Sequence, residues 1–148
     1  KLNTNTMTHP NITLSNYLLD TNHISPLVTP AHPLRKRVLN SLQAGNTFSI
    51  AVPALTELLF GISILPRARQ NLEEWERLKP SFNYYDIDRQ HAEQAAKLQV
   101  ALRRQGWQLE TVDALIATVA LQNNLILLTT DNDFSPISEL QQENWLLP

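Results

Sequence analysis

The sequence of 148 residues contains no cysteine. Disulfide bonds and zinc sites built on thiolates are therefore excluded. The absence is compatible with a reducing cytoplasm, which is where we expect the protein to be found. No apolar run approaches the roughly 20 residues that span a bilayer, and the N-terminal stretch lacks the apolar segment of a signal peptide. We therefore expect no contact with a membrane.

Positive charge is also scarce. Lysine and arginine number 12 against 14 aspartates and glutamates, so the formal net charge is −2. This balance argues against a broadly basic nucleic-acid binder but leaves room for a local basic patch. The four histidines show neither the His-x-His nor the His-Glu-x-x-His spacing of zinc sites. We expect all of them to be surface or incidental residues: His9, His23, His32 and His91.

Hydrophobic residues make up 43% of the chain and charged residues 18%, as in globular proteins. The length favours one domain, which we place over residues 16–148. Residues 1–15 are polar and without periodicity, and are predicted to form a loose, disordered tail. Met7 is an alternative start, in which case residues 1–6 are not native.

Short apolar runs alternate with amphipathic stretches along the chain. The alternation predicts an α/β fold, a three-layer α/β/α arrangement around a central, mostly parallel sheet. The prolines of segment 25–33 are expected to break any regular element. Strands are predicted over 16–20, 47–52, 82–87, 125–129 and 144–147, and helices over 34–44, 53–62, 66–79, 88–105 and 111–122.

Two aspartates directly follow apolar strands. Asp20 comes after Tyr17 to Leu19, and Asp131 follows the run Leu-Ile-Leu-Leu-Thr-Thr. Ligands of open parallel α/β sheets collect at the carboxyl ends of the strands, so both carboxylates would line one crevice if their strands are neighbours. The alternative is a turn or helix-capping role, which aspartate also favours.

Asp113 is the only charged residue between positions 112 and 122, in a helix that is apolar all round. Such a helix is buried. A lone buried carboxylate costs several kcal/mol unless it is paired or binds a metal. The helix macrodipole favours an aspartate in the first turn by only about 0.3–1 kcal/mol, which is too little to offset burial. Asp113 therefore predicts a shared polar site.

Glu57 carries a weaker signal. On a helical wheel it lies away from the apolar stripe that runs from Leu55 to Ile62, so periodicity alone favours a solvated glutamate. Ala54 and Gly61 lie on its side of the helix, and small residues permit the close approach of another part of the backbone. Spacing leaves both interpretations open.

Taken in order, the acidic residues resemble the PIN-domain family, particularly the VapC-type toxin ribonucleases of prokaryotic toxin–antitoxin pairs. The match runs from residue 16 to about residue 147. Four motifs at these separations form a specific signal, whereas Asp-Thr-Asn by itself would carry none. The segments that carry the resemblance are LLDTNHIS, SIAVPALTELLFGI, GWQLETVDALIATVA and LILLTTDNDF.

The resemblance implies a set of site residues. Asn22 and Thr129 would support the metal site. Leu109 departs from the isoleucine usual in the family, and Glu110 and Thr111 stand where glycine or proline is common. Because the last motif is the short Asp-x-Asp-Phe variant, its two aspartates compete for the fourth position. The implied catalytic and metal-binding residues are Asp20, Glu57, Asp113 and Asp131, with Asp133 as a further metal ligand.

The activity that the resemblance implies is hydrolysis of RNA, for example in a tRNA loop, with a carboxylate-held Mg²⁺ or Mn²⁺ activating water. Carboxylates about 4 Å apart repel one another by roughly 4 kcal/mol per pair at an effective dielectric constant near 20, and a hard divalent cation removes that conflict. The alternative is a non-catalytic α/β binding module whose carboxylates hold a structural ion or none. A phosphotransfer domain is disfavoured because position 22 is Asn rather than a second Asp.

RNA would need positive charge near the acidic residues. Candidate contacts are Arg35, Lys36, Arg37, Arg103 and Arg104, although each also fits a solvated helix face. Five aromatic residues could stack on bases, with core or interface packing as the alternative for most: Trp75, Tyr84, Tyr85, Trp107 and Trp145.

The resemblance also implies two protein partners. In the family, the region of helices 53–62 and 66–79 forms a homodimer and a groove for an antitoxin helix. The residues available to line such a groove are Leu59, Phe60, Ile64 and Trp75.

Overall fold

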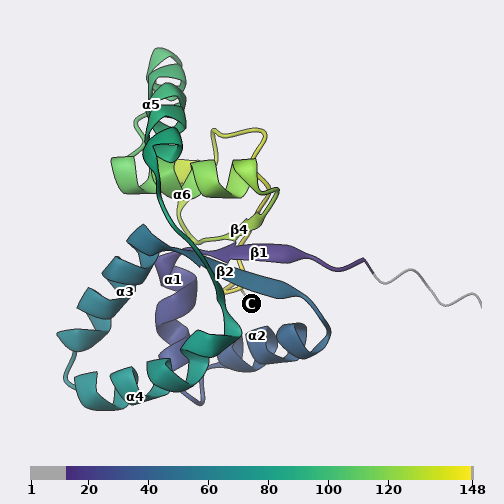
Figure 1. Ribbon diagram of the computed structural model, residues 1–148, viewed down its shortest axis with the longest axis vertical. Coiled ribbons are helices and arrows are strands. Elements are labelled where there is room, and N and C mark those ends of the chain that lie inside the picture. Colours follow the sequence, from purple (N-terminus) through teal and green to yellow (C-terminus); the bar gives the residue numbers. More distant parts are fainter. Residues whose placement is uncertain (1–12, 148) are drawn as a thin grey trace, which may run out of the picture.

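The computed structural model describes residues 13–147 (Figure 1). Most of the predicted tail, including the alternative start at Met7, lies outside the described residues. The last residue of that predicted tail, Ser15, belongs to the fold. Its amide donates to Asn46 Oδ1 at 2.8 Å, and its carbonyl accepts from the amide of Thr47 at 3.1 Å.

A five-stranded sheet forms the centre of the molecule, and all of its neighbouring strands are parallel. Its order is β3-β2-β1-β4-β5, so the first strand of the chain lies in the middle. The predicted α/β class with a central parallel sheet is therefore confirmed. The strands are β1 (Asn16–Leu19), β2 (Thr47–Ala51), β3 (Asn83–Tyr85), β4 (Ile126–Leu128) and β5 (Gln142–Glu143).

Helices cover both faces of the sheet. Figure 1 shows α5 and α6 on one side of the strands and α1 to α4 on the other, which confirms the three layers. No helix within residues 13–147 is both long and apolar enough to cross a membrane. The α-helices are α1 (Thr21–Ile24), α2 (Pro33–Gln43), α3 (Val52–Ser63), α4 (Ala68–Leu78), α5 (Arg89–Arg104) and α6 (Thr111–Gln122), and the 3₁₀ helices are η1 (Ser25–Val28), η2 (Lys79–Ser81) and η3 (Asn132–Phe134).

The prediction that segment 25–33 lacks regular structure is wrong for residues 25–28 and for Pro33, whereas residues 29–32 lie in no helix or strand. Pro26 occupies the first turn of η1, and Pro33 occupies the first turn of α2. The first turn has no partner for a backbone N–H, so proline is tolerated there. Two of the three prolines therefore mark helix starts, and Pro30 lies in the turn between them.

The last strand lies two residues earlier than predicted, at Gln142–Glu143 instead of 144–147. The apolar run that suggested a strand packs on the core instead. The indole ring of Trp145 lies 4.9 Å from the ring of Tyr17 and 5.7 Å from that of Phe48. Arg37 covers the same indole, with its guanidinium carbon 3.9 Å from the ring centroid.

The central strands are buried on both faces, as expected for a parallel sheet between helical layers. Leu18, Leu19, Leu127 and Leu128 are all 0% exposed. Three chain segments begin at the edge of the sheet where these parallel strands end. Helix α1 follows β1 directly, α3 follows β2, and η3 follows β4 after a short turn.

The prediction of surface or incidental histidines is wrong for His23, which is 0% exposed. Its Nε2 accepts from the backbone N–H of Trp145 at 3.0 Å, so Nδ1 carries the proton and donates to Asn22 Oδ1 at 2.7 Å. His32 and His91 also have structural roles, because each accepts from backbone at the start of a helix. His9 lies outside the described residues.

Burial, and after it the charge of Arg37, lower the pKa of His23 from 6.5 to about 4. Between these values the unfolded chain binds a proton that the folded protein does not, so the free energy of unfolding falls as pH drops from 6.5 to 4. By the usual conversion the loss is about 3 kcal/mol. Urea denaturation from pH 7.5 to 4.5 should show the stability advantage of wild type over His23→Phe shrinking through this window. A constant difference between the two proteins would contradict the prediction.

Candidate metal centre

The carboxyl ends of β1 and β4 lie side by side. Leu19 pairs with Leu128 in the parallel register, and the amide of Asp20 donates to the carbonyl of Leu128 at 3.0 Å. Asp20 and Thr129, the next residues of the two strands, therefore meet at the same edge. Thr129 Oγ1 donates to Asp20 Oδ2 at 2.7 Å. The two strands that end before Asp20 and Asp131 are therefore neighbours, which is the condition for both carboxylates to line one crevice.

Asp20 is 6% exposed, and donors surround its carboxylate. Oδ1 accepts from the amide of Thr21 at 2.8 Å, and Oδ2 accepts from Asn22 Nδ2 at 3.1 Å in addition to Thr129. These bonds satisfy the acceptor oxygens of a buried carboxylate. The helix-capping role of Asp20 is real, because Oδ1 caps α1. Asp20 therefore caps α1 and also belongs to the acidic site.

Asn22 is held in one orientation by four contacts. Its Oδ1 accepts from the amide of Thr130 at 3.2 Å and from His23 Nδ1, which leaves Nδ2 to donate to Asp20 and, at 3.4 Å, to Thr129. His23 thus connects the C-terminal segment to a carboxylate of the site. Spacing gave no sign of this role, because its hydrogen-bond partner Trp145 lies 122 residues away.

Glu57 is exposed, yet it faces the site rather than bulk solvent alone. Its Oε2 accepts from Thr21 Oγ1 at 3.2 Å. The buried stripe of α3 is Ala54, Leu58 and Ile62, and Glu57 lies off it, as the helical wheel indicated. The charge of Glu57 also acts on Asp113, so the two carboxylates belong to one acidic group. Thr21, which the motif analysis did not assign, is the hydrogen-bond partner of Glu57.

Three aspartates form the tightest group. One carboxylate oxygen from each of Asp113, Asp131 and Asp133 lies within 4.8 Å of the others. The amide of Asp133 donates to Asp131 Oδ1 at 2.8 Å, and the amide of Asp131 donates to Thr129 Oγ1 at 3.0 Å. Thr129 therefore links this group to Asp20. Both competing aspartates of the last motif lie at the site.

Asp113 has a pKa raised to about 6. Burial is the largest cause, and the negative charges of the other four carboxylates add to it, in the order Asp20, Asp131, Glu57 and Asp133. All four acidic partners are thus close enough to act on Asp113. It lies in the first turn of α6, where the helix dipole favours a negative charge. Burial and repulsion act in the opposite direction to this dipole.

The donor set suits a hard divalent cation. Every candidate ligand is a carboxylate oxygen, which Mg²⁺ and Mn²⁺ prefer over nitrogen or sulfur. A cation among these residues would remove the repulsion that raises the pKa of Asp113. Within residues 13–147, no histidine belongs to the group of close acidic ligands. The acidic residues therefore fit a magnesium or manganese site.

The basic residues predicted to contact RNA differ in availability. Arg35 Nη1 donates to Glu74 at 2.8 Å and to the carbonyl of Leu27 at 3.1 Å, so its charge is engaged within the protein. Arg37 stacks on Trp145. Lys36, Arg103 and Arg104 are exposed. RNA contact by these five residues stays a prediction, weakest for Arg35.

A family model described as the PIN domain matches residues 17–140. Ribonuclease VapC2 of Rickettsia felis is 29% identical over 131 residues, which cover 87% of this chain and 97% of that protein.

Two solved structures share the fold. The crystal structure of VapBC2 from Rickettsia felis bound to a promoter DNA fragment has a TM-score of 0.76 at 26% identity, covering 88% of this chain and 98% of that one. A toxin-antitoxin complex from Klebsiella pneumoniae has a TM-score of 0.62 at 25% identity, covering 84% and 94%. The family model spans most of the fold and contains all five acidic residues, so the chain belongs to the PIN-domain family.

Proposed function

We propose that this protein is a metal-dependent endoribonuclease and the toxin of a toxin–antitoxin pair. The observation that carries the proposal is the convergence of five carboxylates from separate parts of the chain on one edge of the sheet. The similarity to a protein named a ribonuclease and to a toxin-antitoxin complex supports it. The expected cytoplasmic location stays a prediction.

In this proposal the acidic residues hold Mg²⁺ or Mn²⁺. When bound, such a cation lowers the pKa of a water and offsets the charge that develops on the phosphate. Thr129 and Asn22 orient Asp20 through their hydrogen bonds, and Thr21 orients Glu57. The metal-binding residues are Asp20, Glu57, Asp113, Asp131 and Asp133.

An antitoxin helix is the proposed protein partner, together with a second copy of the chain. Phe60 and Ile64 are each 67% exposed, and Leu65 is 50% exposed, at the end of α3 and just beyond it. This apolar surface suits the apolar face of a helix. Trp75 was predicted to be available for the groove, but it is buried and does not line this surface. It stacks on Phe82 with ring centroids 6.0 Å apart.

Cleavage of RNA tests the proposed activity. Total cellular RNA and a tRNA pool are incubated with the protein and Mg²⁺ or Mn²⁺, and the cleavage sites are mapped. Asp20→Asn should lower the cleavage rate about 100-fold or more, because it removes a metal-binding charge. Glu139→Gln, an exposed carboxylate outside the site, is the matched control and should cleave as wild type does. Wild-type protein that cuts none of these RNAs would favour the non-catalytic binding module.

Thermal unfolding tests the metal site without any substrate. At a free Mn²⁺ concentration about 100-fold above Kd, bound metal should stabilise wild type by roughly 2.7 kcal/mol. Asp113→Asn should abolish this shift. The same variant should unfold at a higher temperature than wild type in EDTA at pH 8, because one of the crowded charges is gone. A variant that is less stable in EDTA and still responds to Mn²⁺ would disprove the proposed role of Asp113.

A further inference from the structure

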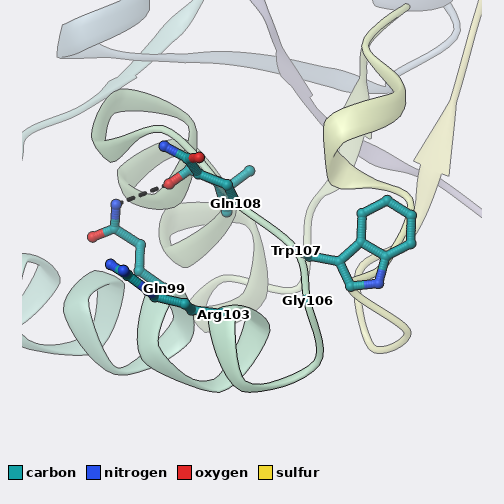
Figure 2. Close-up of a pocket in the computed structure, with 6 residues that line it drawn as sticks. Gln99, Arg103, Gly106, Trp107 and Gln108 are labelled. Atoms are coloured by element: carbon teal, nitrogen blue, oxygen red, sulfur yellow. Dashed lines mark hydrogen bonds between the residues drawn. The ribbon is translucent and has the colours of Figure 1, made fainter.

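A pocket of about 450 Å³ lies at the loop between α5 and α6, just before the helix that carries Asp113 (Figure 2). None of its lining residues is acidic. The residues that line it are Gln99, Arg103, Gly106, Trp107, Gln108 and Leu109.

The loop beside the pocket is held at both ends. The amide of Trp107 donates to the carbonyl of Leu102 at 3.0 Å, and Gly106 adopts a φ of +85°, which favours glycine. On the other side of Trp107, Gln99 Nε2 donates to the carbonyl of Leu109 at 2.9 Å, drawn in Figure 2. Leu109 itself is buried. These contacts fix the backbone that presents the tryptophan.

Trp107 itself is not covered. Its side chain is 51% exposed, whereas Trp75 is 3% exposed and Trp145 packs between aromatic rings and Arg37. Figure 2 shows the indole of Trp107 pointing away from Gln99 and Arg103, on the other side of the loop. A fixed loop that exposes a large aromatic face provides a stacking platform for an unpaired base.

Arg103 supplies positive charge at the same loop. It is exposed, and within residues 13–147 no carboxylate lies within 4.0 Å of its guanidinium. The exposed amide of Gln108 adds a donor and an acceptor that can bind a base edge or a sugar. An exposed arginine with no acidic partner is a favourable position for a phosphate group.

We propose that this loop binds a single-stranded segment of the RNA substrate. A base stacks on Trp107, and Arg103, on the other side of the loop, contacts a phosphate of the same strand. Charge favours a strand that carries phosphates over an apolar helix, because within residues 13–147 the guanidinium of Arg103 has no carboxylate within 4.0 Å. The inference rests on the proposed ribonuclease function and names a subsite for its substrate.

Binding is measured by fluorescence anisotropy with labelled eight-nucleotide oligoadenylate, in the Asp20→Asn background so that the RNA stays intact. Trp107→Ala should weaken binding about 10-fold, in the range of one stacked base. Trp107→Phe should keep affinity within about 3-fold, because it retains a stacking face. An oligonucleotide with abasic sites should lose the difference between parent and Trp107→Ala.

Salt dependence tests Arg103 separately. Arg103→Gln should reduce the slope of log Kd against log salt concentration by about 0.7, the value for one phosphate contact on a single strand. Lys97→Gln removes an exposed charge elsewhere on α5 that does not line the pocket, and it is the matched control with a smaller change in slope. Equal slopes for the two variants, or unchanged affinity in Trp107→Ala, would overturn the proposal.

Cleavage kinetics separate this inference from the function on which it rests. In an otherwise wild-type protein, Trp107→Ala should raise KM about 10-fold with little change in kcat, while the Mn²⁺ stabilisation and the unfolding temperature stay at wild-type values. If wild type cleaves RNA and Trp107→Ala has the same KM, only the subsite fails. If wild type cleaves no RNA but binding still depends on Trp107, the ribonuclease function fails and the RNA subsite stands.

Discussion

Repulsion between carboxylates at one edge of the sheet is the constraint on which the site depends. Hydrophobic burial of β1 and β4 forces their carboxyl ends together, and α6 brings Asp113 against the same edge. The pKa of Asp113 is raised to about 6, because burial and four negative neighbours all disfavour its charged form. A divalent cation among these carboxylates would relieve the conflict.

A hydrogen-bond network holds the carboxylates in place. Thr129 lies at its centre, donating to Asp20 and accepting from the amide of Asp131. Asn22 adds a second donor to Asp20 and is itself oriented by His23. Through His23, the network reaches Trp145 in the last segment of the chain. The site therefore depends on packing at the C-terminus as well as on the acidic motifs.

One buried and one half-buried titratable group give the fold opposite pH dependences. His23 has a lowered pKa, so it stabilises the fold less as pH falls from 6.5 to 4. Asp113 has a raised pKa, so the metal-free fold loses stability as pH rises from 3.8 to about 6. The two windows overlap, and the total stability can therefore change little while each contribution is large. Comparing single variants with wild type is what separates them.

Much of the architecture follows from local patterns. Alternating strands and helices predicted the parallel sheet, and the lone charge of Asp113 in an apolar helix predicted a shared polar site. Local patterns failed for the last strand and for His23, since each depends on contacts far along the chain. They failed for the 3₁₀ helix η1 because proline breaks the interior of a helix but is tolerated in the first turn. The role of Glu57 also could not be predicted locally. A helical wheel places it on one side of its helix but does not show which residues of other elements face that side. The sequence by itself determined which residues are apolar, which are acidic and in what order they follow the strands. Only the tertiary structure decided that these acids meet, because the register of β1 against β4 and the packing of α6 set distances that no local pattern encodes.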